Sequence, residues 1–274
     1  TKNLVGEFTW DTSLTFSKTN SFWKERLPNY DYQIYQQREN EPMSAYYYYN
    51  VTGIINTDRS NMPESQKTLQ AEAQLPGCPI IEDKNKDGKI DENDVYMKDN
   101  SPAIYVGIGN TFTYKRFEFS FFMYGQFGIQ KYNIAYSAAQ AGPLAVDYPE
   151  NSNKFAYRLW NSQTNPNGSR PGLTIGKMGA LPGNAWVNAD RENASFMRMR
   201  NITLAYNLAG NILGSLQRYV RNIKVYVDAQ NPFILTKFQG FDPEIYTGGG
   251  GASGGSRGEY PQTRTFSLGA NITF

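Results

Sequence analysis

Apolar and polar residues alternate with a period of two in several segments of this chain. In residues 7–16, Phe8, Trp10, Leu14 and Phe16 occupy alternate positions, and the residues between them are polar. Successive side chains of a β-strand point to opposite faces, so this pattern predicts a strand with one apolar face. The same alternation recurs in residues 103–114, 117–127, 223–230 and 265–274.

The segments between these predicted strands alternate between short and long. Only Lys115 and Arg116 separate two strands, which predicts a tight hairpin. The stretches 132–193 and 239–261 are long and rich in Asn, Gly and Pro. Short turns at one end and long loops at the other are typical of outer-membrane barrels.

Two further segments are less regular. The alternation changes phase within residues 195–206, where Arg198 and Arg200 would share a face with apolar residues. A β-bulge near Asn201 would restore the alternation. Residues 46–55 predict a weaker strand.

Composition favours lipid as the environment of the apolar faces. Aromatic residues make up 15% of the 274 residues, and the mean hydropathy is -0.59, with no apolar run long enough for a membrane-spanning helix. The polar faces carry mostly Thr, Ser, Gly and Asn, which suits a wide aqueous lumen. We therefore predict an all-β fold, a segment of a transmembrane antiparallel β-barrel, rather than a soluble sandwich or jelly roll.

The same composition excludes several kinds of function. The chain has no histidine and a single cysteine, so it lacks His-based catalysis, His-ligated zinc and an internal disulfide. The formal net charge of +2 gives no reason to expect nucleic acid as a partner. We therefore expect a protein that is not an enzyme.

Residues 83–94 match the calcium-binding loop of EF-hand proteins. Hard oxygen ligands at loop positions one, three, five and twelve, with glycine at position six, suit Ca²⁺ better than Mg²⁺. A polar turn that binds nothing is the alternative. The expected ligands of a structural Ca²⁺ are Asp83, Asn85, Asp87, the Lys89 carbonyl, Asp91 through water, and Asp94.

Other side chains could contact a substrate or partner. Tyr46 and Tyr48 belong to a four-tyrosine run that could stack on sugars or form part of an interfacial aromatic girdle. Trp160 and Trp186 lie in the long loop. Arg198 and Arg200 would line the lumen, whereas Asp242-Pro243-Glu244 suggests a turn more than a catalytic carboxylate pair.

The chain closes on an aromatic residue after a regular strand. Gly269, Ile272 and Phe274 look like the terminal signal read by the machinery that assembles outer-membrane barrels. About seven strands are predicted in all, and open edges are not tolerated in hydrocarbon. We therefore interpret residues 1–274 as part of a longer barrel that supplies the remaining strands.

The ordered motifs resemble the C-terminal barrel of the SusC/RagA family over nearly the whole chain. Arg116 stands where that family commonly has glycine. The motifs are the 83–94 loop, 107–117 (GIGNTFTYKRF), 195–206 (SFMRMRNITLAY), 225–233 (VYVDAQNPF), 240–244 (GFDPE) and 264–269 (RTFSLG).

This resemblance implies a 22-stranded barrel in the outer membrane of a Gram-negative bacterium, crossed many times by the chain. It implies active import through TonB, with the plug and the TonB-contacting region outside this chain. A SusD-like surface lipoprotein would cap the barrel, and the substrate would be an oligosaccharide or peptide. Counting strands back from a periplasmic C-terminus places Lys115-Arg116 in the periplasm and the long loops, including 83–94, outside the cell. A non-transporting adhesin or assembly component, and a secreted β-domain with a dockerin-like calcium loop, are the alternatives.

Overall fold

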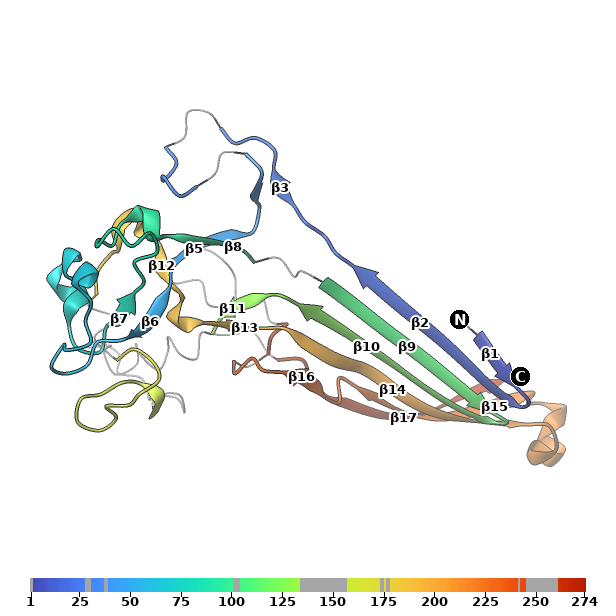
Figure 1. The fold of residues 1–274 in the computed structure, drawn as a ribbon. Helices are drawn as coiled ribbons and strands as arrows, with labels where there is room; N and C mark the ends of the chain where they lie inside the picture. Colours follow the sequence, from blue (N-terminus) through green and yellow to red (C-terminus); the bar gives the residue numbers. More distant parts are fainter. Residues whose placement is uncertain are drawn as a thin grey trace.

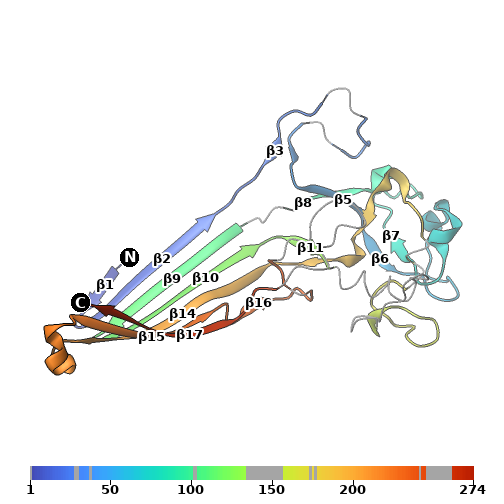
Figure 2. The same ribbon diagram turned by 180° about the vertical axis from the view of Figure 1, so that it is seen from behind.

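The computed structural model describes residues 2–27, 31–36, 39–100, 104–133, 157–172, 175, 178–240, 242–244 and 261–274. These residues form one large antiparallel sheet and a group of smaller sheets and turns beyond one end of it (Figures 1 and 2). Within the described residues, no helix is long and apolar enough to cross a membrane.

The large sheet has eight strands. Seven of them follow the order β1-β2-β9-β10-β14-β15-β17, and the eighth, β16, pairs with β14, which also pairs with β15. All of these pairs are antiparallel. The strands are β1 (Lys2–Val5), β2 (Phe8–Ser17), β9 (Ile104–Tyr114), β10 (Phe117–Phe127), β14 (Phe196–Ala209), β15 (Asn222–Gln230), β16 (Ile234–Thr236) and β17 (Thr265–Thr273). The predicted long strands are confirmed, and β1 is an addition.

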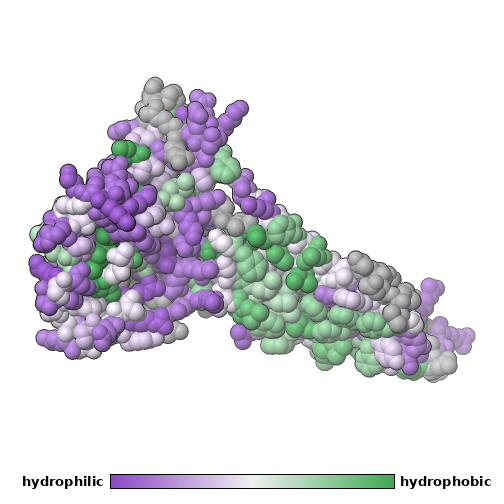
Figure 3. Space-filling model, viewed as in Figure 1, coloured by the Kyte–Doolittle hydropathy of each residue, from purple (hydrophilic) through white to green (hydrophobic). Residues whose placement is uncertain are grey.

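The register places all the apolar rows on one side of the sheet, which we call the apolar face. Leu14 lies opposite Ile108, and Ile108 lies opposite Met123. At the other edge, Val227 lies between Leu204 and Leu268. Figure 3 shows apolar residues gathered over the sheet, and Leu268 is 82% exposed. The apolar face is therefore continuous and has no protein packed on it among the described residues.

The opposite side, the polar face, carries small and polar residues crossed by two ion-pair or hydrogen-bond contacts. Lys224 Nζ lies 2.9 Å from Glu118 Oε1, and the Thr203 hydroxyl donates to Asp228 at 2.6 Å. Phe122, which breaks the polar alternation, lies against the glycine backbone at Gly107 and Gly109. Side chains on this face thus pair across strands instead of forming a second apolar layer.

The connections sort by length to opposite ends of the sheet. Gly6-Glu7, Lys115-Arg116 and the 3₁₀ helix η9 (Gly210–Arg218) turn at one end, where both chain termini also lie (Figure 1). The three long connections, 18–103, 128–195 and 231–264, all leave from the other end. The predicted hairpin at Lys115-Arg116 is confirmed, with Lys115 in the left-handed region at φ 53°.

The long connections build a separate unit that we call the head, formed by residues 45–99 and 157–193. Its short strands are β5 (Ala45–Tyr49), β6 (Val51–Ile54), β7 (Pro79–Ile81), β8 (Tyr96–Asp99), β12 (Trp186–Val187) and β13 (Arg191–Asn193), which pairs with β11 (Gln130–Tyr132). Its 3₁₀ helices are η1 (Glu64–Thr68), η2 (Ala71–Gln74), η3 (Glu92–Asp94), η7 (Pro182–Asn184) and η8 (Asn188–Asp190). The hairpin of β3 (Phe22–Trp23) and β4 (Glu41–Pro42) links it to the sheet.

The head contains a hydrophobic core of its own. Tyr49, Ile55 and Cys78 are fully buried there, together with Ile90 and Val95 from the candidate calcium loop and its flank. The prediction of a single strand over 46–55 is wrong, because this segment forms two short strands, β5 and β6, which belong to different small sheets. Loops of this length need such a core, because they could not otherwise bury enough apolar surface to order themselves.

Gly269 on the polar face makes the close approach of β17 and the Tyr226 ring possible. A Cβ at Gly269 would lie 2.4 Å from Tyr226 Cζ. We expect Gly269→Val to destabilise the whole protein in detergent micelles by about 1–3 kcal/mol, as overpacking does, measured by urea unfolding. The Tyr226→Ala background should remove most of this penalty, and Ala270→Val on the exposed face is the matched control. An equal loss in both backgrounds would contradict the contact.

Candidate functional site

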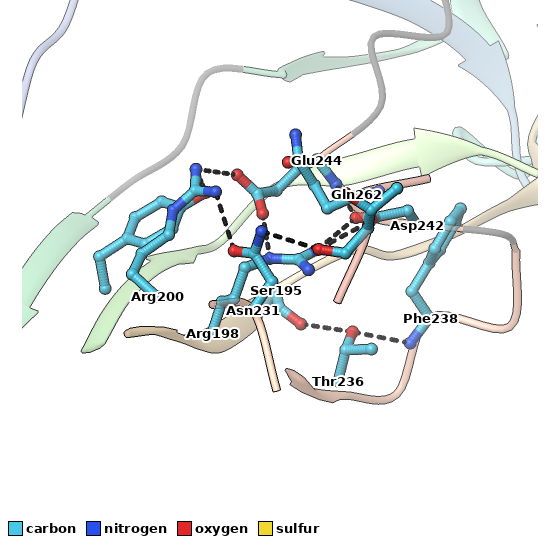
Figure 4. A network of polar contacts seen from close by, with 11 residues as sticks. Ser195, Arg198, Arg200, Asn231, Thr236, Phe238, Asp242, Glu244 and Gln262 are labelled. Carbon is cyan, nitrogen blue, oxygen red and sulfur yellow. Dashed lines mark hydrogen bonds and ion pairs between the residues drawn. The ribbon is translucent and has the colours of Figure 1, made fainter. Parts of the chain in front are cut away.

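Two arginines and two carboxylates meet where the polar face joins the head (Figure 4). Arg198 Nη2 lies 2.6 Å and 2.8 Å from the two carboxylate oxygens of Asp242, and Arg198 Nε contacts Glu244. Arg200 Nη2 lies 3.0 Å from Glu244 Oε1. The cluster joins β14 to the segment that follows β16, 44 residues further along the chain.

Neutral groups complete the cluster. Arg200 donates to Asn231 Oδ1 at 3.2 Å, and its guanidinium lies 4.6 Å from the centroid of the Tyr124 ring. Asp242 also accepts backbone hydrogen bonds from Glu244 at 2.9 Å and Gln262 at 3.2 Å. The charges balance, and the side chain of Arg198 is only 4% exposed. Such a cluster holds the β16–β17 connection against the sheet, since a buried charge requires its partner.

The strand geometry explains why both arginines reach this face. The register between β10 and β14 shifts from the pair Phe122–Asn201 to the pair Met123–Met199, so Arg200 is the extra residue of a β-bulge. The bulge predicted near Asn201 is therefore present. It places Arg198 opposite Tyr124 on the polar face. Their carboxylate partners were missed, since the sequence indicated only a turn at Asp242-Pro243-Glu244.

The 83–94 segment folds as a compact loop in which carboxylate and amide oxygens accept backbone hydrogen bonds. Asp83 accepts from Gly88 at 2.9 Å, and Asp87 accepts from Lys89 at 2.9 Å. Asp94 is fully buried and accepts from Lys84 at 2.8 Å and Asp91 at 2.9 Å. The backbone of the loop therefore curls around its own acidic side chains.

The fit of this loop to a cation is mixed. Within the part of the chain that the structure describes, no three His, Cys, Asp or Glu side chains gather closely enough to hold a metal. The expected ligand set, however, also includes the Asn85 amide and the Lys89 carbonyl. The second carboxylate oxygen of Asp83 is buried without a hydrogen-bond partner, so this oxygen is available to a cation.

The aromatic candidates all lie in the head, so an interfacial girdle in the large sheet is the wrong interpretation of the tyrosine run. Tyr46 and Tyr48 stack at 5.1 Å, and Tyr48 stacks on Tyr96 at 5.7 Å. Trp160 lines an open groove, and the backbone of Trp186 pairs with Tyr48. The structure thus brings four of the predicted contact residues into one unit, far from the apolar face.

The three residues of the expected assembly signal lie at the edge strand of the sheet. Gly269 and Ile272 belong to β17, and Phe274 follows it. Ile272 and Phe274 are 51% and 79% exposed on the side of the apolar face. Their role as a signal stays a prediction.

The chain is similar in sequence and in fold to receptors of the bacterial outer membrane. The TonB-dependent receptor P3 of Formosa agariphila is 26% identical over 98% of this chain, and the TonB-dependent receptor SusC of Bacteroides thetaiotaomicron is 31% identical over 70% of it. A structure of the RagAB peptide transporter matches all of this chain with a TM-score of 0.68 at 20% identity. No family model matches. The chain spans 17% of the SusC relative and 27% of P3.

A one-sided apolar sheet with long loops at one end, aligned along its length with such receptors, defines a segment of an outer-membrane β-barrel receptor rather than an enzyme. Within that class, the chain belongs to the SusC/RagA family of TonB-dependent receptors.

Breaking the buried Arg198–Asp242 pair should lower the stability of the protein more than breaking the partly exposed Lys224–Glu118 pair. We expect Asp242→Ala to destabilise the whole protein by about 3–5 kcal/mol, because it leaves Arg198 buried with one carboxylate fewer. Glu118→Ala, which breaks the partly exposed pair with Lys224, should cost at most about 1 kcal/mol. Urea unfolding in micelles and limited proteolysis of residues 231–264 provide the measurements. Equal effects of the two changes would show that the cluster does not fix this connection.

Proposed function

We propose that this chain is the C-terminal part of the barrel of a transporter that actively imports an oligomeric nutrient, a glycan or a peptide, across the outer membrane of a Gram-negative bacterium. Energy would come through TonB, which would contact the part of the protein outside this chain. A SusD-like surface lipoprotein would form the lid. The alignment of this chain with TonB-dependent receptors over 98% of its length is the main support.

The exposed apolar face supports the membrane part of this proposal. Phe16, Phe266 and Leu268 are each at least 66% exposed, although they stand at the positions that a soluble sandwich would bury. A secreted soluble domain with this surface would aggregate. Acyl chains cover such a face in a barrel that the rest of the protein closes.

The difference between the two ends of the sheet supports an orientation of the protein in the membrane. The head is large and polar, and it stands at the end opposite the short turns (Figure 3). Outer-membrane barrels keep short turns in the periplasm and long loops outside. The head would therefore face the cell exterior, where substrate and lipoprotein arrive.

The function is tested with the full-length protein in its own bacterium. We expect a lipoprotein to co-purify with it, and uptake of its labelled oligomeric substrate to stop when the proton gradient is collapsed. Deletion of the TonB-contacting segment should have the same effect. The amount of protein in the outer membrane and the uptake of a porin-permeant monosaccharide are the controls. Uptake that persists without a proton gradient, or a protein that purifies alone, would contradict the proposal.

The acidic loop would hold a structural Ca²⁺ in the head. Asp83, Asn85, Asp87, the Lys89 carbonyl and Asp94 would supply oxygen ligands, with Asp91 through water. The ion would fix a loop whose Ile90, together with Val95 on its flank, belongs to the core of the head. The buried, unpaired oxygen of Asp83 supports this assignment.

Removal of two acidic ligands tests the calcium proposal. We expect Asp83→Ala combined with Asp87→Ala to remove about one equivalent of Ca²⁺ per protein, measured by elemental analysis after dialysis. Protease cleavage within residues 83–94 should increase. Asp58→Ala together with Glu72→Ala, outside the loop, is the charge-matched control. Unchanged calcium content in the double variant would contradict the site.

A further inference from the structure

An open groove of about 650 Å³ crosses the head. Strand β6 forms one wall, Trp160 and residues 166–171 form another, and Asn188, Ala189 and Arg191 complete it. Its volume lies within the usual range of ligand sites. Its described lining residues include four asparagines and two arginines but no Asp or Glu, so its polar groups suit an anion and hydroxyl groups.

Arg191 supplies the charge of this groove. Arg170, the other arginine, is paired with Glu192 at 3.0 Å. The side chain of Arg191, in contrast, makes no ion pair or hydrogen bond with any residue that the structure describes, and its guanidinium lies 3.7 Å from the centroid of the Tyr46 ring. A stacked guanidinium keeps its edge available for two parallel hydrogen bonds to a carboxylate or sulfate.

A row of three stacked tyrosines, Tyr46, Tyr48 and Tyr96, supports the guanidinium of Arg191. Tyr46 stacks on Tyr48 with an interplanar angle of 26°, and Tyr48 stacks on Tyr96 at 21°. The Tyr46 hydroxyl donates to Gln130 Oε1 at 2.6 Å, and burial raises the pKa of Tyr46 to about 12. Tyr46 therefore stays neutral and fixed, and the cation above it is preorganised.

Trp160 offers a flat apolar surface in the same groove. Its backbone N–H donates to the Arg170 carbonyl at 2.8 Å. Gly168 and Gly172 are packed around it, because a Cβ at Gly168 would lie 2.5 Å from Trp160 Cα and one at Gly172 would lie 3.3 Å from its indole. The tryptophan is partly exposed and rigidly held, which suits stacking against the C–H face of a sugar ring.

We propose that this groove is a binding subsite for an anionic oligosaccharide, one that carries carboxylate or sulfate groups. The acidic group binds Arg191, a sugar ring stacks on Trp160, and ring hydroxyls bind amides such as that of the exposed Asn167. This inference rests on the proposed import function and specifies its substrate class. A peptide is less suited, because the lining offers no carboxylate for an amine and the groove is open rather than divided into apolar side-chain pockets.

The test measures binding to the full-length transporter with its lipoprotein by calorimetry. The probes are tetragalacturonate, a sulfated carrageenan tetrasaccharide, neutral maltotetraose and tetraglutamate. We expect one of the two anionic saccharides to bind about 10-fold or more tightly than maltotetraose and tetraglutamate, and Arg191→Ala to weaken that binding by about 10–100-fold. Arg191→Lys should retain part of the affinity, and Trp160→Ala should weaken binding about 10-fold.

Matched controls separate the groove from general effects. Arg218→Ala, at the opposite end of the sheet, and Trp23→Ala, in the β3–β4 hairpin, should bind as the unaltered protein does. Because only the transporter is changed, binding by the lipoprotein alone gives a constant background. The preferred anionic saccharide identifies whether a uronate or a sulfate is recognised.

Several outcomes would overturn the inference. Unchanged binding in Arg191→Ala would remove the groove as the site, and tetraglutamate binding as tightly as the best saccharide would remove the substrate class. A transporter that imports neutral sugars or peptides through TonB but binds neither anionic probe would lose this inference and keep the proposed function. Uptake that is independent of the proton gradient would instead contradict the proposed function.

Discussion

The rest of this structure depends on one constraint: hydrocarbon offers no hydrogen-bond partner to a peptide group. Every N–H and C=O that crosses a bilayer must therefore pair within the protein, and a sheet does so between neighbouring strands. Once the strands are fixed in this way, their side chains divide strictly between two environments. The alternation of the strands places Leu14, Ile108 and Leu268 on the apolar face. The same alternation places Thr113, Ser120 and Asp228 on the polar face. The edges at β1 and β17 have no further partner among the described residues, so the rest of the barrel must supply one.

The head obeys a different rule, because water surrounds it. Its connections bury Tyr49, Ile55 and Ile81 in an ordinary hydrophobic core, which also takes in Ala185, 136 residues beyond Tyr49 in the chain. The Arg198–Asp242 contact fixes the connection after β16 against strand β14 of the sheet. Buried ion pairs add little net stability compared with apolar packing, but they fix one arrangement of the groups they join. A connection that must keep one position beside a lumen gains from that specificity.

Sequence reasoning succeeded where the period-two pattern is a direct consequence of the lipid constraint. The pattern predicts the long strands, the Lys115-Arg116 turn and a bulge near Asn201, because a one-residue slip would turn apolar side chains into the lumen. It failed in the head, where Tyr46 and Tyr48 belong to a short strand whose partners, β8 and β12, come from distant segments. For a similar reason, the sequence predicts only a turn at Asp242 and Glu244: local sequence describes a turn well but does not show which arginines it faces. Contacts between distant segments are set by tertiary packing, which leaves no periodic signal.

The same distinction explains why substrate chemistry is to be sought in the head and not in the sheet. The polar face offers small residues and pairs its charges internally, as Lys224 does with Glu118 and Arg198 with Asp242. A lumen lined in this way presents few free charges to a passing molecule. In the head, by contrast, Arg191 is held against Tyr46 without a carboxylate partner among the described residues. Desolvating a cation without a counter-charge is costly, so such a group persists where a ligand, rather than the protein, supplies the missing anion. Selectivity would then be applied at the entrance, before the substrate reaches a lumen that makes few distinctions of its own.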